Sequence, residues 1–256
     1  LRKDAPDTTF ACARTRNHSL SVATRATLLS THARIHLAAT VPESFADRLR
    51  GKDAQVVRSG AVYDEAVAIA LKDADETGAI LLADGSWPGY TRLPAWVMEG
   101  YTVIPEELRR RFAATGLWPT HVFVQAGVGG IAAAMAHQIR AHWPAETEIV
   151  VVEPTAARCL AVSHAAGAPA TADGPVSTMS RLDCKDPSLL AFHALEAAGV
   201  RYVDVSDDEA EAAVLDLQSV GIGTSPSGAA GFAGLKKTGL PEQARPLVIA
   251  TETVIA

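Results

Sequence analysis

Short apolar runs alternate with amphipathic stretches along most of the chain. The runs have the length of buried strands, and the stretches between them repeat apolar residues with the period of a helix. Strands are expected over residues 10–13, 35–38, 54–57, 79–82, 121–125, 148–152, 202–205 and 246–251. Helices are expected over residues 20–29, 43–49, 63–74, 94–114, 131–142, 156–166, 187–198, 207–218 and 226–237. Because parallel strands need crossover helices, this alternation predicts an α/β fold with doubly wound parallel sheets.

A loop rich in glycine, proline and aromatic residues interrupts the alternation at residues 85–93. Such a loop is typical of a boundary between units. We therefore expect two unequal parts, a smaller α/β unit over residues 1–84 and a larger one over residues 85–256. The sequence starts just before one expected strand and ends on another, so we expect both ends to be cuts through a larger fold.

The sharpest local signal is a glycine-rich turn between an expected strand and an expected helix. Gly127, Val128, Gly129 and Gly130 follow the strand 121–125 almost directly. Glycine allows a positive φ and a close approach of the backbone to a ligand. The free N–H groups at the start of the following helix attract a phosphate. The turn therefore predicts an anion cradle.

The same turn also allows two other interpretations. It can be a tight strand–helix connection with no ligand, or it can be part of a dinucleotide fingerprint. For the fingerprint, Gly127, Gly129 and Ala132 match the G-x-G-x-x-[GA] spacing, and Glu153 follows the next expected strand. A nucleotide site requires Glu153 to face a ribose, so the environment of this carboxylate distinguishes the interpretations.

Composition narrows the choice of partners. The net charge is −6 and no basic run is present, which argues against nucleic acid or an anionic membrane as the main partner. No apolar stretch reaches the roughly 20 residues that span a bilayer. The sparse cysteines, Cys12, Cys159 and Cys184, form neither a disulfide framework nor a zinc motif. These features indicate a protein of a reducing, cytoplasmic compartment.

Several longer segments decide between the interpretations of the turn. They are residues 84–90 (DGSWPGY), 96–101 (WVMEGY), 120–130 (THVFVQAGVGG), 152–154 (VEP), 182–188 (LDCKDPS), 227–231 (SGAAG) and 251–252 (TE). In this order they resemble the motifs of pyridoxal phosphate (PLP)-dependent enzymes of the tryptophan-synthase-β fold type, fold type II. Within that group the chain resembles the diaminopropionate ammonia-lyases, over nearly its whole length.

The resemblance implies roles for particular residues. The loop from Gly127 to Gly130, with Val128 and Gly129, would hold the phosphate of PLP through its N–H groups. Asn17 would contact the 3′-oxygen of the cofactor, and Thr251 would lie near the pyridine nitrogen. The implied activity is that of a carbon–nitrogen lyase, which converts a small amino acid such as 2,3-diaminopropionate into a 2-keto acid and ammonia. The implied assembly is a homodimer.

Asp84 is the candidate acid–base residue. It follows an expected strand, and ligands of parallel sheets bind at the carboxyl ends of the strands. The reaction needs a group that removes the α-proton of the substrate, and a carboxylate in reach can accept it. A capping or loop aspartate is the alternative, but the surrounding signature favours the catalytic role.

The chain also departs from the family pattern. Enzymes of this type carry a Schiff-base lysine, on a helix well upstream of the Asn17 loop. The lysines of this chain are Lys3, Lys52, Lys72, Lys185, Lys236 and Lys237. None of them occupies that place, so we expect the lysine segment to be absent. The protein is then truncated, a degenerate paralogue, or completed by another polypeptide.

The loop around Asn17 differs as well. Where the family has T-D-G-N-H-G, this chain reads RTRNHS over residues 14–19. Thr15 replaces an aspartate that is a candidate second base, and Arg16 and Ser19 replace glycines. Two further functions therefore remain open beside the lyase. One is a non-catalytic remnant that binds PLP or a paralogue, and the other is a nicotinamide-dependent oxidoreductase.

The lysine pattern yields a first test. We expect that the chain mixed with PLP forms no stable covalent link to a specific lysine. Visible spectra before and after borohydride reduction, followed by peptide mapping, measure this. A reducible link on one defined lysine would overturn the expectation.

Overall fold

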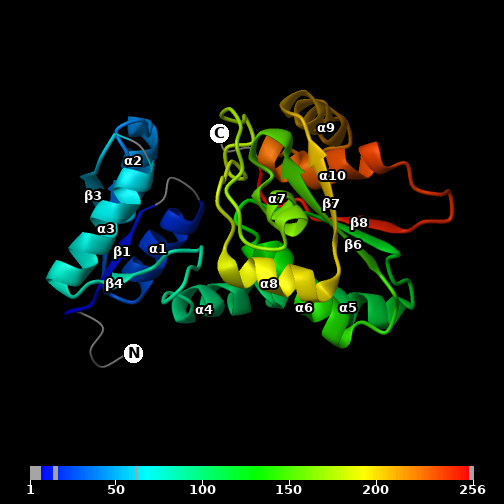
Figure 1. Ribbon diagram of the computed structural model, residues 1–256, viewed down its shortest axis with the longest axis horizontal. Coiled ribbons are helices and arrows are strands. Elements are labelled where there is room, and N and C mark those ends of the chain that lie inside the picture. Colours follow the sequence, from blue (N-terminus) through cyan, green and yellow to red (C-terminus); the bar gives the residue numbers. More distant parts are fainter. Residues whose placement is uncertain (1–6, 14–16, 62, 254–256) are drawn as a thin grey trace. The chain divides into compact units, whose positions relative to one another are not determined.

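The computed structural model describes residues 7–13, 17–61 and 63–253 (Figure 1). The chain divides into two compact parts, Leu1–Ala83 and Asp84–Ala256, called unit 1 and unit 2 below. In its described residues, each unit has a four-stranded sheet whose neighbouring strands are all parallel. Helices connect the strands along the chain. The predicted α/β fold with parallel sheets is therefore confirmed.

Unit 1 is built around its second strand. Its strands are β1 (Thr9–Cys12), β2 (His32–Leu37), β3 (Gln55–Arg58) and β4 (Ile80–Leu81), in the order β3-β2-β1-β4. Its helices are α1 (Asn17–Leu28), α2 (Glu43–Arg50) and α3 (Tyr63–Thr77). Ile35 and Leu37 of β2 are fully buried together with Leu49 of α2 and Ala23 of α1. Burial of this apolar surface is the main stabilising contribution to the unit.

Unit 2 carries a second sheet in the order β7-β6-β5-β8. Its strands are β5 (His121–Gln125), β6 (Glu148–Pro154), β7 (Arg201–Val205) and β8 (Pro246–Val248). Its helices are α4 (Arg92–Tyr101), α5 (Val103–Thr115), α6 (Gly130–His142), η2 (Thr155–Ala157), α7 (Cys159–Ala166), α8 (Leu189–Ala198), α9 (Asp207–Ser219) and α10 (Pro226–Thr238). No described helix has the length and apolar content to cross a membrane.

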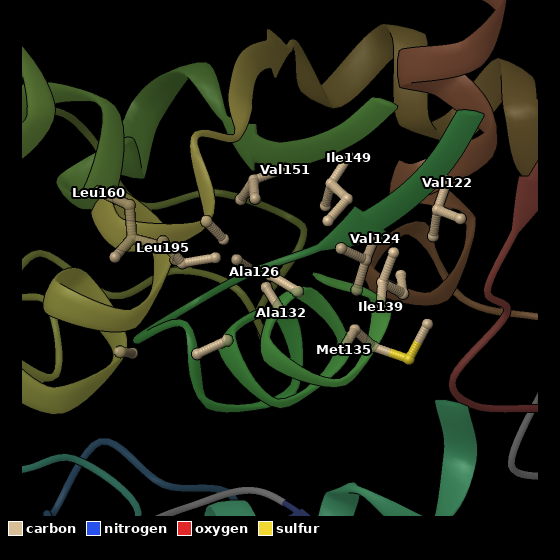
Figure 2. Close-up of a cluster of buried hydrophobic side chains, with 14 of the residues drawn as sticks. Val122, Val124, Ala126, Ala132, Met135, Ile139, Ile149, Val151, Leu160 and Leu195 are labelled. Atoms are coloured by element: carbon tan, nitrogen blue, oxygen red, sulfur yellow. The ribbon is translucent and has the colours of Figure 1, made fainter. Parts of the chain in front are cut away.

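The central strands β5 and β6 bury both of their faces. Val122 and Val124 pack with Met135 and Ile139 of α6 (Figure 2). The alternate residue Phe123 belongs to a separate cluster that includes residues of α9 and α10. Because successive residues of a strand point to opposite faces, these two clusters show that helices cover both sides of the sheet.

Helix α10 lies unusually close to the sheet, and its glycines make this possible. A Cβ added to Gly234 would stand 2.6 Å from Val152 Cγ2, and one added to Gly231 would stand 2.8 Å from Gln125 Oε1. Distances this short are not compatible with an ordinary side chain. The small residues of α10 therefore set its distance from β5 and β6, the strands whose carboxyl ends lead into the candidate site.

Several expected elements differ in the structure. The helix expected over residues 156–166 is divided into η2 and α7, with Arg158 between them. The helix expected over residues 94–114 is broken at Thr102 into α4 and α5. Pro105 lacks an N–H group and its ring excludes a helical carbonyl four residues earlier, at Tyr101. It therefore fits in the first turn of α5 but not inside one continuous helix. The strand expected over residues 246–251 ends at Val248, although the N–H of Ile249 still donates to the carbonyl oxygen of Phe123 at 3.3 Å.

The close approach of α10 can be tested with two helical glycines. Gly234→Ala should destabilise unit 2 by about 1–3 kcal/mol, because the clash with Val152 outweighs the better helix propensity of alanine. Gly100 in α4 has no neighbour within 4 Å of a built Cβ, so Gly100→Ala should be neutral or stabilise by up to about 1 kcal/mol.

Urea unfolding followed by tryptophan fluorescence measures both effects, since Trp87, Trp96, Trp118 and Trp143 all lie in unit 2. Equal free energies of unfolding for the two variants would contradict the role of Gly234 in the spacing of α10.

Candidate functional site

The glycine turn leaves a row of backbone donors without partners. Strand β5 ends at Gln125, and α6 begins at Gly130 after Gly129, which has a φ of +100°. In the part of the chain that the structure describes, no N–H group of residues 127–132 donates to a backbone or side-chain acceptor. Buried or half-buried N–H groups rarely stay unpaired without water or a ligand. The row therefore fits an anion such as a phosphate, at a helix N-terminus whose dipole also favours negative charge.

Neighbouring atoms of unit 2 leave room only for glycine at two of these positions. A Cβ on Gly127 would stand 2.8 Å from Cys184 Sγ and 3.2 Å from the carbonyl oxygen of Arg181. A Cβ on Gly129 would stand 3.0 Å from Ala191 Cβ. A Cβ on Gly130 would meet only ordinary contacts, at 3.7 Å or more. Gly127 and Gly129 thus hold the loop against its support, whereas a side chain at Gly130 would fit beside Tyr101 and Met98.

A buried amide lies beside the loop and orients a hydroxyl. Gln125 is 4% exposed, and its Nε2 donates to Thr251 Oγ1 at 2.8 Å and faces the carbonyl oxygen of Gly228 at 3.4 Å. The carbonyl of Gly228 fixes which end of the amide is the donor. Because Thr251 accepts this hydrogen bond, its own proton remains available for another acceptor.

Sequence reasoning did not identify Gln125. The signal that could have found it is its position, because a lone amide ends an otherwise apolar strand (HVFVQ) directly before the glycine turn. Its neighbour Thr251 was expected from the resemblance, and the structure brings the two side chains together although they are far apart along the chain.

Asp84 is half-buried, and the segment that follows it is tied to the glycine loop through serine side chains. The N–H of Ser86 donates to Ser188 Oγ at 3.1 Å, and the N–H of Leu190 donates to Ser86 Oγ at 2.9 Å. The N–H of Ser188 in turn donates to the carbonyl oxygen of Val128 at 3.0 Å. The hydrogen bonds between Ser86, Ser188 and Val128 therefore fix the start of unit 2 to the loop.

Asn17 belongs to unit 1, whereas the glycine loop, Asp84 and Thr251 belong to unit 2. Asn17 is exposed and is the first residue of α1, whereas a helix was expected only from residue 20. The following residues anchor this helix, since His18 Nε2 lies 3.1 Å from the carbonyl oxygen of Leu82 and Ser19 is fully buried. Arg14, Thr15 and Arg16 lie outside the described residues.

Glu153 is a structural carboxylate and does not face a groove. It is 1% exposed, and its two oxygens accept the N–H groups of Leu160 and Ala161, both at 2.8 Å. Burial raises its pKa to about 7, although these backbone hydrogen bonds act in the opposite direction. A ribose cannot reach oxygens that are buried and already bonded, so the structure argues against the dinucleotide interpretation.

Lys185 is engaged by oxygen acceptors. Its Nζ donates to the carbonyl oxygens of Ala156 at 2.6 Å and Pro175 at 2.8 Å, and to Asp183 at 2.8 Å. An amine engaged by three oxygen acceptors is not free to attack a cofactor carbonyl carbon. Lys72, Lys236 and Lys237 form ion pairs on the surface, and Lys3 lies outside the described residues.

A second polar cluster in unit 1 combines serine, histidine and aspartate. His36 Nδ1 lies 2.8 Å from Ser59 Oγ, and its Nε2 lies 3.3 Å from Asp73. Both His36 and Ser59 are buried, and Asp73 also pairs with Arg34 at 2.7 Å. A nucleophile that no substrate can reach does not make a hydrolase, so this cluster is a buried structural network.

Comparison with known proteins identifies the group to which this site belongs. The sequence profile of the family described as "Pyridoxal-phosphate dependent enzyme" matches residues 1–252. The chain belongs to this family. Its membership confirms the resemblance inferred from the motifs and indicates PLP as the cofactor, and the open N–H groups of residues 127–132 fit the phosphate of that cofactor.

Two curated relatives illustrate the similarity. The chain is 29% identical over 234 residues to diaminopropionate ammonia-lyase of Escherichia coli (strain K12), across 89% of this chain and 58% of that protein. It is 32% identical over 233 residues to the biosynthetic L-threonine dehydratase of Mycobacterium leprae (strain TN), across 89% of this chain and 52% of that protein. The chain thus spans little more than half the length of these relatives.

The fold is shared with solved structures of the same kind. The crystal structure of diaminopropionate ammonia-lyase from Escherichia coli in complex with an aminoacrylate-PLP azomethine reaction intermediate matches with a TM-score of 0.87 and 27% identity. That match covers 96% of this chain and 68% of the other. This chain therefore has the fold of type II PLP enzymes.

The raised pKa of Glu153 predicts a specific pH dependence of stability. The unfolded chain releases the Glu153 proton near the ordinary pKa of 4.5, whereas the folded chain keeps it until about 7. The contribution of this group to stability is full below the lower value and is lost as pH rises through the higher one. Glu153→Gln should therefore reduce the decline in the free energy of unfolding between about pH 5 and 8, by up to about 3 kcal/mol.

Glu209→Gln provides the control, because hydrogen bonding to the N–H of Ser206 lowers the pKa of Glu209 and moves its titration below this range. Urea unfolding of unit 2 by tryptophan fluorescence measures the slope for each protein. Parallel pH profiles for the parent and Glu153→Gln would show that Glu153 is ionised in the folded chain throughout this range.

Proposed function

We propose that this chain carries the cofactor site and the acid–base residue of a PLP-dependent carbon–nitrogen lyase. Its substrate is a small amino acid such as 2,3-diaminopropionate, and its products are a 2-keto acid and ammonia. The observation that carries the proposal is the row of unpaired N–H groups at residues 127–132, at the start of α6, in a member of the PLP family. The similarity to diaminopropionate ammonia-lyase supports the reaction class.

In this proposal the residues of unit 2 bind and orient the cofactor. Gly127, Val128, Gly129 and Gly130 hold its phosphate through backbone N–H groups. Thr251 donates its hydroxyl proton to the pyridine nitrogen, because Gln125 occupies the acceptor side of that hydroxyl. Fixed donors of this kind need little reorganisation when the ligand binds.

The remaining roles concern the substrate and the ring. When bound, PLP supplies an electron sink for the charge left by a departing α-proton. Asp84 accepts that proton on its carboxylate, and the Ser86–Ser188 hydrogen bonds keep its segment beside the loop. Asn17 would donate its side-chain amide to the 3′-oxygen of the ring.

We also propose the cell compartment, the assembly and the domain boundaries. The described cysteines, Cys12, Cys159 and Cys184, are all buried and free, which supports a reducing cytoplasmic environment.

A homodimer is proposed from the resemblance alone, and light scattering after size-exclusion chromatography tests it. Residues 1–84 and 85–256 are proposed as the two domains.

A non-catalytic remnant is the second candidate function. The observation that favours it is the state of Lys185, since this lysine is bound by three oxygen acceptors and does not serve as the Schiff-base residue. The remnant would keep the phosphate cradle and would bind PLP without turnover. Cofactor binding and product formation must therefore be measured separately.

The cradle is tested by a change that disturbs only the loop. Gly127→Ala should weaken PLP binding about tenfold or more, because its Cβ meets Cys184 Sγ and the backbone beneath the loop. Gly100→Ala, whose new Cβ meets nothing within 4 Å, should bind like the parent. Quenching of tryptophan fluorescence by added PLP measures the affinity. Unchanged PLP affinity in Gly127→Ala would show that this loop does not bind the phosphate.

The acid–base role is tested by turnover. The chain with PLP and a primary amine in the buffer, which substitutes for a lysine, should release keto acid and ammonia from 2,3-diaminopropionate. Asp84→Asn should lower this rate by about 10² or more while PLP affinity stays at the parental value. Binding of PLP with no turnover in the parent would favour the remnant, and equal rates would exclude Asp84 as the base.

A further inference from the structure

The first turn of α7 depends on a carboxylate from outside the helix. Arg158, the residue that precedes α7, makes no side-chain capping hydrogen bond. The N–H groups of Leu160 and Ala161 are instead accepted by Glu153, which stands at the carboxyl end of β6. Leu160 and Glu153 are both almost fully buried, so water cannot replace this acceptor. Glu153 is therefore the cap that holds α7 in place.

The capped turn lies directly against the glycine loop. Leu160 Cδ1 and Cδ2 stand 3.1 and 3.2 Å from the place where a Cβ on Gly129 would be. Cys159 Sγ lies 3.6 Å from the carbonyl oxygen of Gly127 and acts as a weak donor. The two loop glycines that leave no room for a side chain are thus both contacted by the turn that Glu153 caps.

We propose that Glu153 is a positioning residue of the phosphate loop. By capping α7 it fixes Leu160 against Gly129 and Cys159 against Gly127, and so keeps the loop N–H groups directed toward an anion. The carboxylate acts through α7 and does not touch the ligand. This inference rests on the proposed role of the loop as a phosphate cradle.

The chain offers a matched control for this role. Glu209 is also a helix-capping carboxylate, since it accepts the N–H of Ser206 at 2.7 Å in the capping box of α9. Helix α9 packs on α10. Loss of either cap should lower the unfolding temperature, whereas only the cap of α7 should change anion binding.

The test compares Glu153→Gln with Glu209→Gln in the full chain, with inorganic phosphate and PLP as probes. Glu153→Gln should weaken the affinity for both probes by about fivefold. It should also shift the amide signals of residues 127–132 in nitrogen-15 spectra recorded without ligand. Glu209→Gln should keep the parental affinity and the parental signals of these residues.

Three other outcomes would overturn the inference. If both variants lose stability and neither loses affinity, Glu153 is a structural residue only and the cradle itself stands. If the parent binds neither probe, the cradle and the positioning role fall together. If Glu153→Gln does not fold, Leu160→Val keeps the cap and shortens the side chain that touches Gly129, and unchanged affinity in that variant sinks the proposal.

Discussion

The candidate site depends on one constraint, which is that the backbone between β5 and α6 must present its N–H groups without pairing them. Such groups are costly to leave unsatisfied, so the fold has to hold them open by other means. Three segments do this from below. The chain at Arg181–Cys184 leaves no space beside Gly127, the first turn of α7 contacts Gly129, and Ser188 at the start of α8 binds the carbonyl oxygen of Val128. Each contact fixes the loop and leaves its N–H groups free.

The packing of unit 2 explains why this edge of the sheet is rigid enough to support a site. Strands β5 and β6 are buried on both faces, by helices such as α6 on one side and α10 on the other. Helix α10 approaches so closely that Gly234 stands against Val152. A sheet packed this tightly is hard to compress, so the carboxyl ends of β5 and β6 have well-defined positions. Gln125 and Glu153 both occupy these ends, one beside Thr251 and the other beneath α7.

Burial and hydrogen bonding distinguish the two ligand classes, PLP and a dinucleotide, that the glycine turn alone allows. A dinucleotide site needs an accessible carboxylate for a ribose, but the carboxylate of Glu153 is buried and bonded to two N–H groups. A PLP site needs donors for a phosphate and a hydroxyl for a ring nitrogen. The unpaired N–H groups of the loop and the Thr251 hydroxyl, which Gln125 orients, are the groups that we propose for these two roles. Family membership agrees with this choice.

The sequence by itself determined the strands and helices, the glycine turn and the family, because apolar periodicity, glycine conformation and motif order are local properties of the chain. It did not determine the break at Thr102, the cap supplied by Glu153, or the pairing of Gln125 with Thr251. The hydrogen bond between Ser86 and Ser188 joins residues 102 positions apart, and no local pattern contains that information. Whether a polar side chain is a ligand or a support depends on its burial and on the partner it meets, and only the tertiary structure decides both.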